Sequence, residues 1–399
     1  MKRLPARHPD WIGHLVLSSV DDSIQHEEFG RSGRYKETGD ELHVFWNDHV
    51  PEIFHLDVTE NIYVWLCWID KEPKDQENLY IDKKNEETEY LFITTHEDGN
   101  ALLRVQSKPL YNGLLYLKKN ASYQHVSNNE SDKITYSKNI IIHHDDNHAI
   151  NIAINSKKKH KSKIYCHTSD IFSINYYVGL SNVVDIFVAP TDLHAEVLRS
   201  AVSIPVITVP EGVDYIAEPK GNFSIPVGVT DRICWFGYPE SFEKSFRYLL
   251  PYFFNNTGCS GEDFGVITRS GIKIIEEALH INFDIKTFYA DIALFRYALL
   301  SHFAYDHHIN TYIKSPNKLV TSLVRGLIPI VSNTVNYRPI MQEYGLEDWM
   351  FSGPVQLQKL LRKVKNGHRP DENFIRLAGE NLRSSLAPAG LAKTFLEVI

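Results

Sequence analysis

An alternation of short apolar strands and helices runs twice along this chain and constrains its fold more than any other feature. Apolar runs bounded by turn residues favour buried strands, and an order of strand, helix and strand favours parallel pairing. In the first run we expect strands at 139–142, 163–166, 183–189 and 205–209, and helices at 148–156 and 193–201. The sequence therefore predicts an α/β protein with two tandem Rossmann-like parallel-sheet domains.

The second run starts near residue 232. Its strands are expected at 232–236, 265–268, 281–284, 302–304 and 328–331, and its helices at 241–254, 272–279, 291–300, 319–325, 357–364 and 374–386. Between the two runs, Pro and Gly residues from 210 to 228 have the composition of an interdomain connection. We therefore expect a first domain over 1–215, a second over 216–388, and a terminal helix over 389–399 that crosses back to the first.

The chain before residue 137 is less regular. Strands are expected at 14–19, 42–46 and 62–69, where β-branched and aromatic residues gather. Charged residues dominate 70–89, which is typical of a solvated insertion.

The segment 315–332 is the most informative single stretch. Ser315, Asn317 and Lys318 precede an apolar helix, Gly326 follows it where a positive φ is cheap, and a buried strand comes next. Free backbone N–H groups at a helix start, together with a cation, suit a phosphate. We interpret the segment as a clamp for a diphosphate and a ribose.

This segment resembles the donor-binding element of GT-B glycosyltransferases, in which a Lys-Leu-leading helix is followed by Gly, Pro and a Val/Ile strand. Many retaining members carry a glutamate on this helix to hold the donor ribose, and here Thr321 and Ser322 take its place. The phrases at 165–170, 182–191 and 209–214 are similar to GT-B enzymes that build bacterial surface polysaccharides. The resemblance implies a donor site in the second domain, an acceptor site in the first and a cleft between them.

Further donor contacts are expected where strands of the second domain end. Arg269 and Ser270 follow one strand, and the resemblance implies that the basic residue contacts the donor phosphates. Gly237 and Tyr238 follow another, where a glycine lets the backbone approach a phosphate. Glu240 is a further polar candidate. A surface arginine and a plain turn glycine are the structural alternatives.

The densest cluster of titratable groups is His143, His144, Asp145 and Asp146, placed between a strand and a helix. A histidine oriented by an aspartate is the usual form of a general base. Adjacent histidines in an extended segment point in opposite directions, so one at most would serve. A metal site and a helix cap by Asp145 or Asp146 are the alternatives. His167 and Asp170 follow the next strand and are candidates for binding the acceptor.

Two other polar runs have open interpretations. Residues 306–308, Asp-His-His, either contact the sugar or form a loop without function. Five lysines among residues 157–163 either form a solvated helix end or contact an anionic membrane surface that carries a lipid-linked acceptor.

Composition limits the partners and the compartment. The 399 residues include 42 basic and 50 acidic side chains, a net charge of −8 that disfavours a nucleic-acid partner. The four cysteines lie far apart, as in reduced cytoplasmic proteins. No signal peptide or membrane span is evident, so we expect a soluble cytoplasmic protein, with peripheral contact at the inner membrane face as the alternative.

The sequence thus predicts transfer of a sugar from a nucleotide donor to a glycan or lipid-linked saccharide, in synthesis of O-antigen or capsule. No cofactor beyond the donor is expected, and no metal, because no Asp-x-Asp pair ends a strand in the second half. UDP, GDP and CMP donors stay open, as do retention and inversion. A sugar-nucleotide epimerase or hydrolase and a non-catalytic glycan-binding or scaffolding protein are the alternatives.

Overall fold

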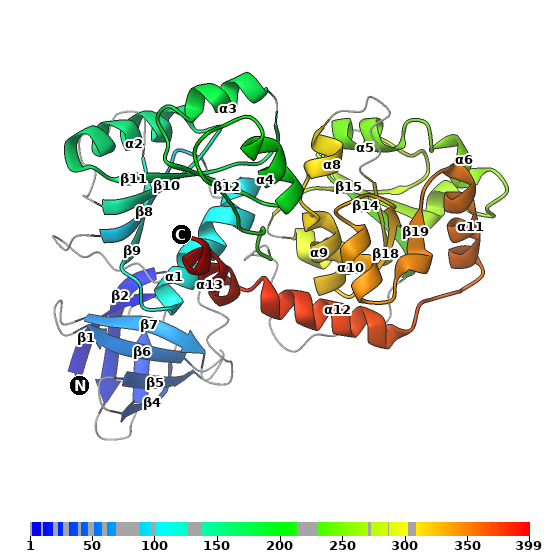
Figure 1. Cartoon of the computed structure of the whole chain (residues 1–399). Coiled ribbons are helices and arrows are strands. Elements are labelled where there is room, and N and C mark those ends of the chain that lie inside the picture. The colour runs from blue at the N-terminus through cyan, green and yellow to red at the C-terminus, as the bar shows by residue number, and fades with distance from the viewer. Residues whose placement is uncertain are drawn as a thin grey trace.

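The computed structural model describes residues 2–8, 11–18, 23–26, 32–38, 41–46, 52–57, 62–68, 88–96, 100–126, 137–171, 173–213, 230–269, 273–285, 287–301 and 309–399. The described strands belong to a small barrel and two larger parallel sheets (Figure 1). The prediction of two Rossmann-like parallel-sheet domains is confirmed.

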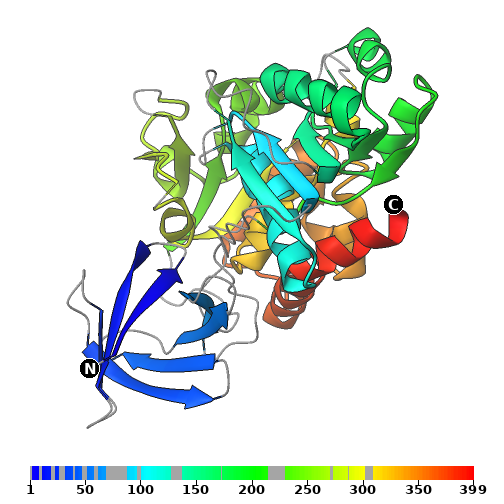
Figure 2. The same ribbon diagram turned by 90° about the vertical axis from the view of Figure 1, so that its left-hand side faces the viewer.

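The first strands of the chain form a closed barrel in which sequence neighbours pair antiparallel and β1 pairs with β7 in parallel. The strands are β1 (Lys2–His8), β2 (Trp11–Ser18), β3 (Ser23–His26), β4 (Ser32–Thr38), β5 (Glu41–Trp46), β6 (Glu52–Asp57) and β7 (Ile62–Trp68). In Figures 1 and 2 these strands lie apart from the two parallel sheets. The sequence predicted three of the strands but not their closure, which leaves no open sheet edge.

The first domain contains a six-stranded parallel sheet with the order β13-β12-β11-β10-β8-β9. Its strands are β8 (Thr88–Thr94), β9 (Ala121–His125), β10 (Ser137–His143), β11 (Lys163–His167), β12 (Ile186–Ala189) and β13 (Val206–Thr208). Its helices are the π-helix η2 (Leu103–Ser107), α1 (Lys108–Tyr116), α2 (Asn147–His160), α3 (Ile174–Leu180) and α4 (Asp192–Arg199).

Both faces of this sheet are buried, which explains its continuous apolar strands. Ile140 and Ile142 of β10 pack in one core with α2 and α4, whereas Ile141 packs in another with α1. Successive side chains of a strand point to opposite faces, so a strand covered on both sides needs an unbroken apolar run.

The second domain contains a six-stranded parallel sheet with the order β16-β15-β14-β17-β18-β19. Its strands are β14 (Thr230–Phe236), β15 (Phe264–Thr268), β16 (Leu279–Asn282), β17 (Phe295–Leu300), β18 (Ile328–Ser332) and β19 (Met350–Phe351). The α-helices that follow in the chain are α5 (Pro239–Phe246), α6 (Pro251–Phe254), α7 (Phe288–Ile292), α8 (Asn310–Ile313), α9 (Asn317–Val324), α10 (Arg338–Glu343), α11 (Pro354–Lys365), α12 (Glu372–Ser385) and α13 (Pro388–Val398).

Three helix predictions in this domain were wrong. Residues 291–300 form the end of α7 and then strand β17, because a short apolar run fits a buried strand as well as a helix. The expected helix 241–254 ends at Phe246, and Pro251 starts the separate α6. The described part of 272–279 forms no helix before β16 begins. The predicted strand 302–304 lies outside the described residues.

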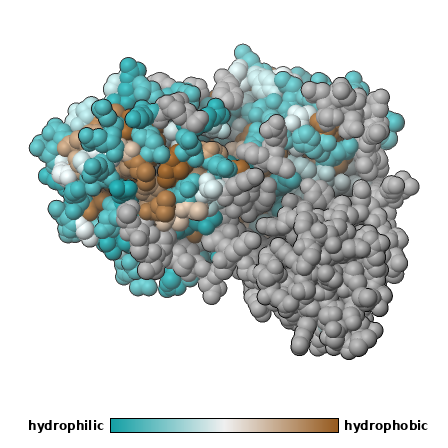
Figure 3. Space-filling view, turned by 180° about the vertical axis from the view of Figure 1, so that it is seen from behind, coloured by the Kyte–Doolittle hydropathy of each residue, from teal (hydrophilic) through white to brown (hydrophobic). Residues whose placement is uncertain are grey.

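The second domain also exposes apolar side chains. Leu279 in the edge strand β16 and Phe283 just after it are 39% and 42% exposed, and Leu294, which precedes β17, is 52% exposed. Seen from behind, hydrophobic side chains gather in one area of this domain on an otherwise largely hydrophilic surface (Figure 3). Within the ranges described, no helix combines the length and apolar composition that a membrane crossing requires.

Helix α13 leaves the second domain and packs on the first, beside α1 (Figure 1). Phe395 of α13 lies in the same core as Tyr90 and Tyr165 of the first sheet and meets both rings edge to face. The contact with α1 is so close that a Cβ atom on Gly113 would lie 1.9 Å from the carbonyl oxygen of Pro388. One face of the first sheet is therefore covered by the end of the chain.

Candidate active site

The strand order of each sheet reverses at one point, and ligands of open parallel sheets bind beyond the carboxyl ends of the strands at such points. The reversal lies between β8 and β10 in the first sheet and between β14 and β17 in the second. His96 lies just beyond the end of β8, and the predicted cluster 143–146 lies at the end of β10. Gly237 and Tyr238 follow β14.

His143 is enclosed by the protein. Its ring is 1% exposed, and Nε2 lies 2.5 Å from the hydroxyl of Ser107 at the end of η2. Burial, and then the proximity of His167, lowers the pKa of His143 well below its usual value. The enclosure of this imidazole and its bond to Ser107 favour a structural role for His143 over that of the base.

His144 points to the other side of the strand, as expected for adjacent residues. Its Nε2 lies 2.7 Å from the hydroxyl of Ser169, its Nδ1 lies 3.3 Å from that of Tyr177, and its carbonyl oxygen accepts from Tyr176. The side chain is 2% exposed, and burial lowers its pKa. His144 therefore joins β10 to α3 and is not a base candidate either.

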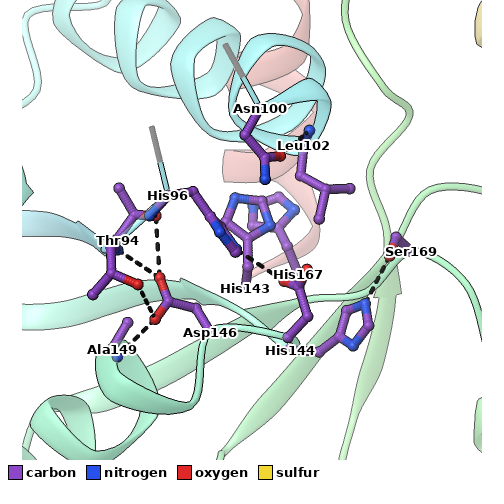
Figure 4. A network of polar contacts seen from close by, with 12 residues as sticks. Thr94, His96, Asn100, Leu102, His143, His144, Asp146, Ala149, His167 and Ser169 are labelled. Atoms are coloured by element: carbon purple, nitrogen blue, oxygen red, sulfur yellow. Dashed lines mark hydrogen bonds and ion pairs between the residues drawn. The ribbon is translucent and has the colours of Figure 1, made fainter. Parts of the chain in front are cut away.

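Asp146 caps α2. Its carboxylate accepts from the backbone N–H groups of Ala149 at 3.0 Å and Thr95 at 2.6 Å, and from the hydroxyls of Thr94 and Thr95 (Figure 4). Burial acts to raise the pKa of Asp146, but the hydrogen bonds from Ala149 and Thr95 outweigh it and hold that pKa below its usual value. Its oxygens are committed to holding β8 and α2 together, so the alternative of a helix cap applies.

His96 forms a pair with Asp145. Its Nε2 lies 3.1 Å from Oδ1 of Asp145, and the two side chains are 19% and 40% exposed. Figure 4 shows the rings of His96, His143 and His167 close together, with centroids 6.1 Å apart for His96 and His143. This is the one imidazole of the three that combines an aspartate partner with access to solvent. The sequence analysis missed His96 because it assigned residues 90–96 to no element, so the end of β8 was not recognised.

His167 and Asp170, the predicted acceptor contacts, differ in accessibility. His167 is 3% exposed, and burial lowers its pKa to about 4. Its Nε2 has no hydrogen-bond partner in the described part of the chain. Asp170 is half-buried and forms an ion pair at 3.5 Å with Lys314 of the second domain. The acceptor role of both residues stays a prediction.

In the second domain, Lys318 and Gly237 are in close contact. A Cβ atom at position 237 would lie 2.5 Å from Nζ of Lys318, and Gly237 has φ +148°, a conformation that favours glycine. The ammonium also lies 5.2 Å from the ring centroid of Trp235. Burial, and then the charge of Lys314, lowers the pKa of Lys318 to about 7. No ion pair to Lys318 is present within the described ranges.

Arg269 stacks on Tyr238 beside the same turn. Its guanidinium carbon lies 4.6 Å from the ring centroid, and Tyr238 is 53% exposed. Thr268 donates to the carbonyl oxygen of Gly237 at 2.8 Å, which ties the ends of β14 and β15 together. Glu240 is exposed in the first turn of α5. Ser270 and residues 306–308 lie outside the described residues.

Helix α9 has the predicted form, and Gly326 after it has φ +73°. The hydroxyl of Thr321 donates to Oδ1 of Asn317 at 3.1 Å, and that of Ser322 donates to the carbonyl oxygen of Lys318 at 2.8 Å. Ser322 is completely buried and Thr321 is 6% exposed, and the donor-binding role of both hydroxyls stays a prediction. Ser315 is half-buried before the helix.

Hydrogen bonds connect the two domains around these residues. Arg104 of η2 donates to the hydroxyl of Tyr289 at 3.4 Å. Asn310 accepts from the N–H of Ile171 at 2.6 Å, and Thr191 donates to the carbonyl oxygen of Ile313 at 3.0 Å. Ile313 belongs to α8 in sequence, yet its side chain lies in the core of the first domain. The segment just before α9 is therefore held by the first domain.

The comparisons with solved structures identify the fold. T4 phage β-glucosyltransferase in complex with UDP-glucose aligns with a TM-score of 0.54 and 13% identity, over 78% of this chain and 99% of the other. An Anabaena protein, HepE, in complex with UDP and glucose aligns with a TM-score of 0.54 and 11% identity, over 78% of this chain and 98% of the other. The lipopolysaccharide outer core galactosyltransferase WaaB aligns with a TM-score of 0.50 and 11% identity, over 78% of this chain and all of the other.

At these identities the likeness establishes the fold alone, and the chain has the GT-B fold that the sequence predicted. No protein-family model matches the chain, and no curated protein matches it in sequence.

Proposed function

We propose that this protein is a glycosyltransferase that moves a sugar from a nucleotide-sugar donor to a hydroxyl group of an acceptor. The observation that carries the proposal is a GT-B fold with an accessible His96–Asp145 pair at the switch point of one sheet and, beside that of the other, Lys318, which forms no ion pair with any residue that the structure describes. Three structural neighbours are sugar transferases or bind UDP and glucose, which supports a nucleotide-sugar donor.

His96 takes the proton of the acceptor hydroxyl as this oxygen attacks the anomeric carbon of the donor. Asp145 orients the imidazole through Nε2 and stabilises the imidazolium that forms, which leaves Nδ1 for the acceptor. A base of this kind suits direct displacement with inversion at the anomeric carbon. His96 is thus proposed as the general base, the role that was expected for a residue of the cluster 143–146.

Lys318 compensates the charge that develops on the leaving diphosphate. The backbone N–H groups at the start of α9, beside Ser315 and Asn317, add oriented dipoles at the same place. Gly237 leaves the space in which the ammonium lies. Arg269, stacked on Tyr238, is a second cation for the same donor. Glu240, in the first turn of α5, follows Tyr238 closely in sequence. Because these cations supply the positive charge, transfer should survive treatment with EDTA.

We further propose that the acceptor is a glycan or a lipid-linked saccharide in surface polysaccharide synthesis. A neighbour that acts on the lipopolysaccharide core supports this class. Another neighbour is described as a DNA-modifying enzyme, but the net charge of −8 of this chain disfavours a polyanionic acceptor.

A thermal-shift panel of UDP, GDP and CMP tests the donor first. A nucleotide at about 100 times its dissociation constant adds about 2.7 kcal/mol of stability. The stabilising nucleotide is then supplied as its sugar conjugate with saccharide acceptors. Transfer supports the proposal, free sugar without transfer favours a hydrolase, and an epimer favours an epimerase. Absence of any stabilising nucleotide favours a non-catalytic glycan-binding or scaffolding protein.

A further inference from the structure

Glu211 bridges the two domains at the start of α9. It follows β13, and its Oε1 accepts from Nε2 of Gln106 in η2 at 3.0 Å. Its Oε2 accepts from Nδ2 of Asn317, the first residue of α9, at 3.1 Å. The carboxylate therefore lies between the π-helix of the first domain and the proposed donor helix of the second.

The two amides that hold Glu211 are themselves held in place. Nε2 of Gln106 also donates to the carbonyl oxygen of Thr168 at 3.2 Å, and Oδ1 of Asn317 accepts from Thr321 one turn along α9. Residues four apart share one face of a helix. Glu211 thus reaches the face of α9 that includes Thr321, where the resemblance to retaining enzymes leads one to expect a carboxylate.

Glu211 retains unused capacity to accept hydrogen bonds. A carboxylate offers about four lone-pair sites, and the two amide bonds occupy two of them. Among the residues that the structure describes, the partners of the Glu211 carboxylate are these two neutral amides and no lysine, arginine or histidine, and Glu211 is only half-buried. Beside it, Oε1 of Gln106 is buried without a hydrogen-bond partner in the described ranges. This arrangement suits a neutral ligand that donates from more than one hydroxyl.

We infer that Glu211 binds a pair of neighbouring hydroxyl groups of the donor and so replaces, from the first domain, the carboxylate that α9 lacks. This inference rests on the proposed function and adds a residue that selects the donor. Neighbouring hydroxyls occur on the ribose and on the transferred sugar. Because Glu211 is anchored from both domains, it also makes donor binding depend on their docking.

The test compares ligand selectivity in the wild type and Glu211→Gln by titration calorimetry. The ligands are the stabilising nucleoside diphosphate, its 2′-deoxy form and its sugar conjugate. A hydrogen bond to a charged group is strong enough for about a tenfold loss of affinity when either partner is removed. The wild type should bind either the 2′-deoxy form about tenfold more weakly than the nucleoside diphosphate, or the nucleoside diphosphate about tenfold more weakly than its sugar conjugate. Glu211→Gln should abolish that difference in affinity.

Two further variants separate binding from structure. Gln106→Leu removes one bond to Glu211 and the unpartnered Oε1 beside it but keeps the carboxylate, so it should keep more of the ligand discrimination than Glu211→Gln does, even if its stability falls. Glu380→Gln alters an exposed carboxylate of α12 that pairs with Arg376, and should change neither quantity. A purely structural Glu211 would weaken all ligands equally and leave their ratios unchanged.

If Glu211→Gln loses the discrimination against the 2′-deoxy ligand, Glu211 binds the ribose. If it loses the discrimination between the sugar conjugate and the nucleoside diphosphate, Glu211 binds the transferred sugar. Unchanged ratios in Glu211→Gln overturn the inference while leaving the proposed function intact. Failure of the wild type to bind any nucleotide instead overturns the proposed function itself.

Discussion

Gly237 and Lys318 are so close that a Cβ atom at position 237 would lie only 2.5 Å from the ammonium of Lys318. The contact joins the end of β14 to the start of α9. It explains why the turn after this strand accepts no side chain, and it keeps the lysine beside the turn where a donor diphosphate is proposed to bind.

Gly237→Ala should displace Lys318 and strain the backbone, because φ +148° disfavours any residue with a Cβ atom. We expect a loss of more than about 1 kcal/mol in the free energy of unfolding and weaker binding of the nucleoside diphosphate. Chemical denaturation and calorimetry measure the two effects. Gly179→Ala in α3 is the matched control, since no described atom outside its own helix lies within 4 Å of its Cβ position. Equal behaviour of both variants would contradict the assignment.

Donor binding should depend on pH through Lys318. Its pKa of about 7 in the free protein means that the ammonium loses its proton as the pH rises through that value. The affinity for a diphosphate should therefore fall from pH 6 to pH 8, with proton uptake on binding. Because burial of the charged ammonium opposes folding, its cost in the free energy of unfolding is full below about pH 7 and is lost as the pH rises from there to the unfolded value near 10.4. Lys318→Met should weaken binding and remove the pH dependence, and a profile unchanged by this variant would exclude Lys318 as its source.

His96→Ala should lower kcat by about 10²–10⁴-fold with little effect on donor affinity, as expected for loss of a general base. Asp145→Asn should give a smaller loss because it removes only the partner of the imidazole. Initial rates with varied donor and acceptor separate kcat from KM. His125→Ala, at the end of neighbouring strand β9 and exposed, is the control. If His143→Gln proves as inactive as His96→Ala while remaining folded, the base has been assigned to the wrong ring.

Asp146→Ala should destabilise the protein by about 2 kcal/mol, since it removes a helix cap and leaves the N–H of Thr95 without its acceptor. Asp371→Ala, at the exposed cap of α12, should cost about 1 kcal/mol or less. Urea denaturation compares the two. Near-equal losses would mean that the bonds to Thr94 and Thr95 contribute little.

The same carboxylate should contribute to acid sensitivity. Its pKa in the folded protein lies below the unfolded value, so its stabilisation is complete above about pH 3.9 and disappears as the pH falls through the folded pKa. Asp146→Asn should be less stable than the wild type at neutral pH and show a shallower loss of stability in acid. Parallel curves for the two proteins would rule out this contribution.

The lysines at the end of α2 offer a test of membrane contact. Lys157 is committed to Asp185 at 2.7 Å, whereas Lys158, Lys159 and Lys161 are exposed. Changing these three to Gln should weaken the free energy of binding to anionic vesicles, measured by sedimentation, by about 1 kcal/mol for each charge. Binding to neutral vesicles should not change. Binding that stays the same would leave these lysines as a solvated helix end.

The fold was predictable where local pattern and burial agree. Strand β10 and helix α2 alternate as a covered parallel sheet requires, and Gly326 ends α9 with the expected positive φ. Strand β17 was misassigned because Phe295–Leu300 is short, apolar and buried on both faces, so periodicity does not distinguish it from a helix. Closure of the barrel depends on pairing of β1 with β7, which no local pattern reveals.

The candidate site was predictable in place but less so in its residues. The sequence located the cluster at the end of β10, yet which of its side chains are accessible depends on neighbours such as Ser107 and Ser169, far away in the chain. His96 requires recognition of β8, whose run Tyr90–Leu91–Phe92–Ile93 is a strand signal that was available. Glu211 gains its position only from Gln106 and Asn317.

Phe395 packs against Tyr90 and Tyr165, so the first sheet is synthesised early but can complete its core only after α13 has been made. When the strands of the first sheet leave the ribosome, the helix that shields one of their faces has not yet been made. The nascent chain must keep this apolar face from aggregating until α13 emerges. Loss of α13, which follows the second domain in sequence, would therefore damage the first domain.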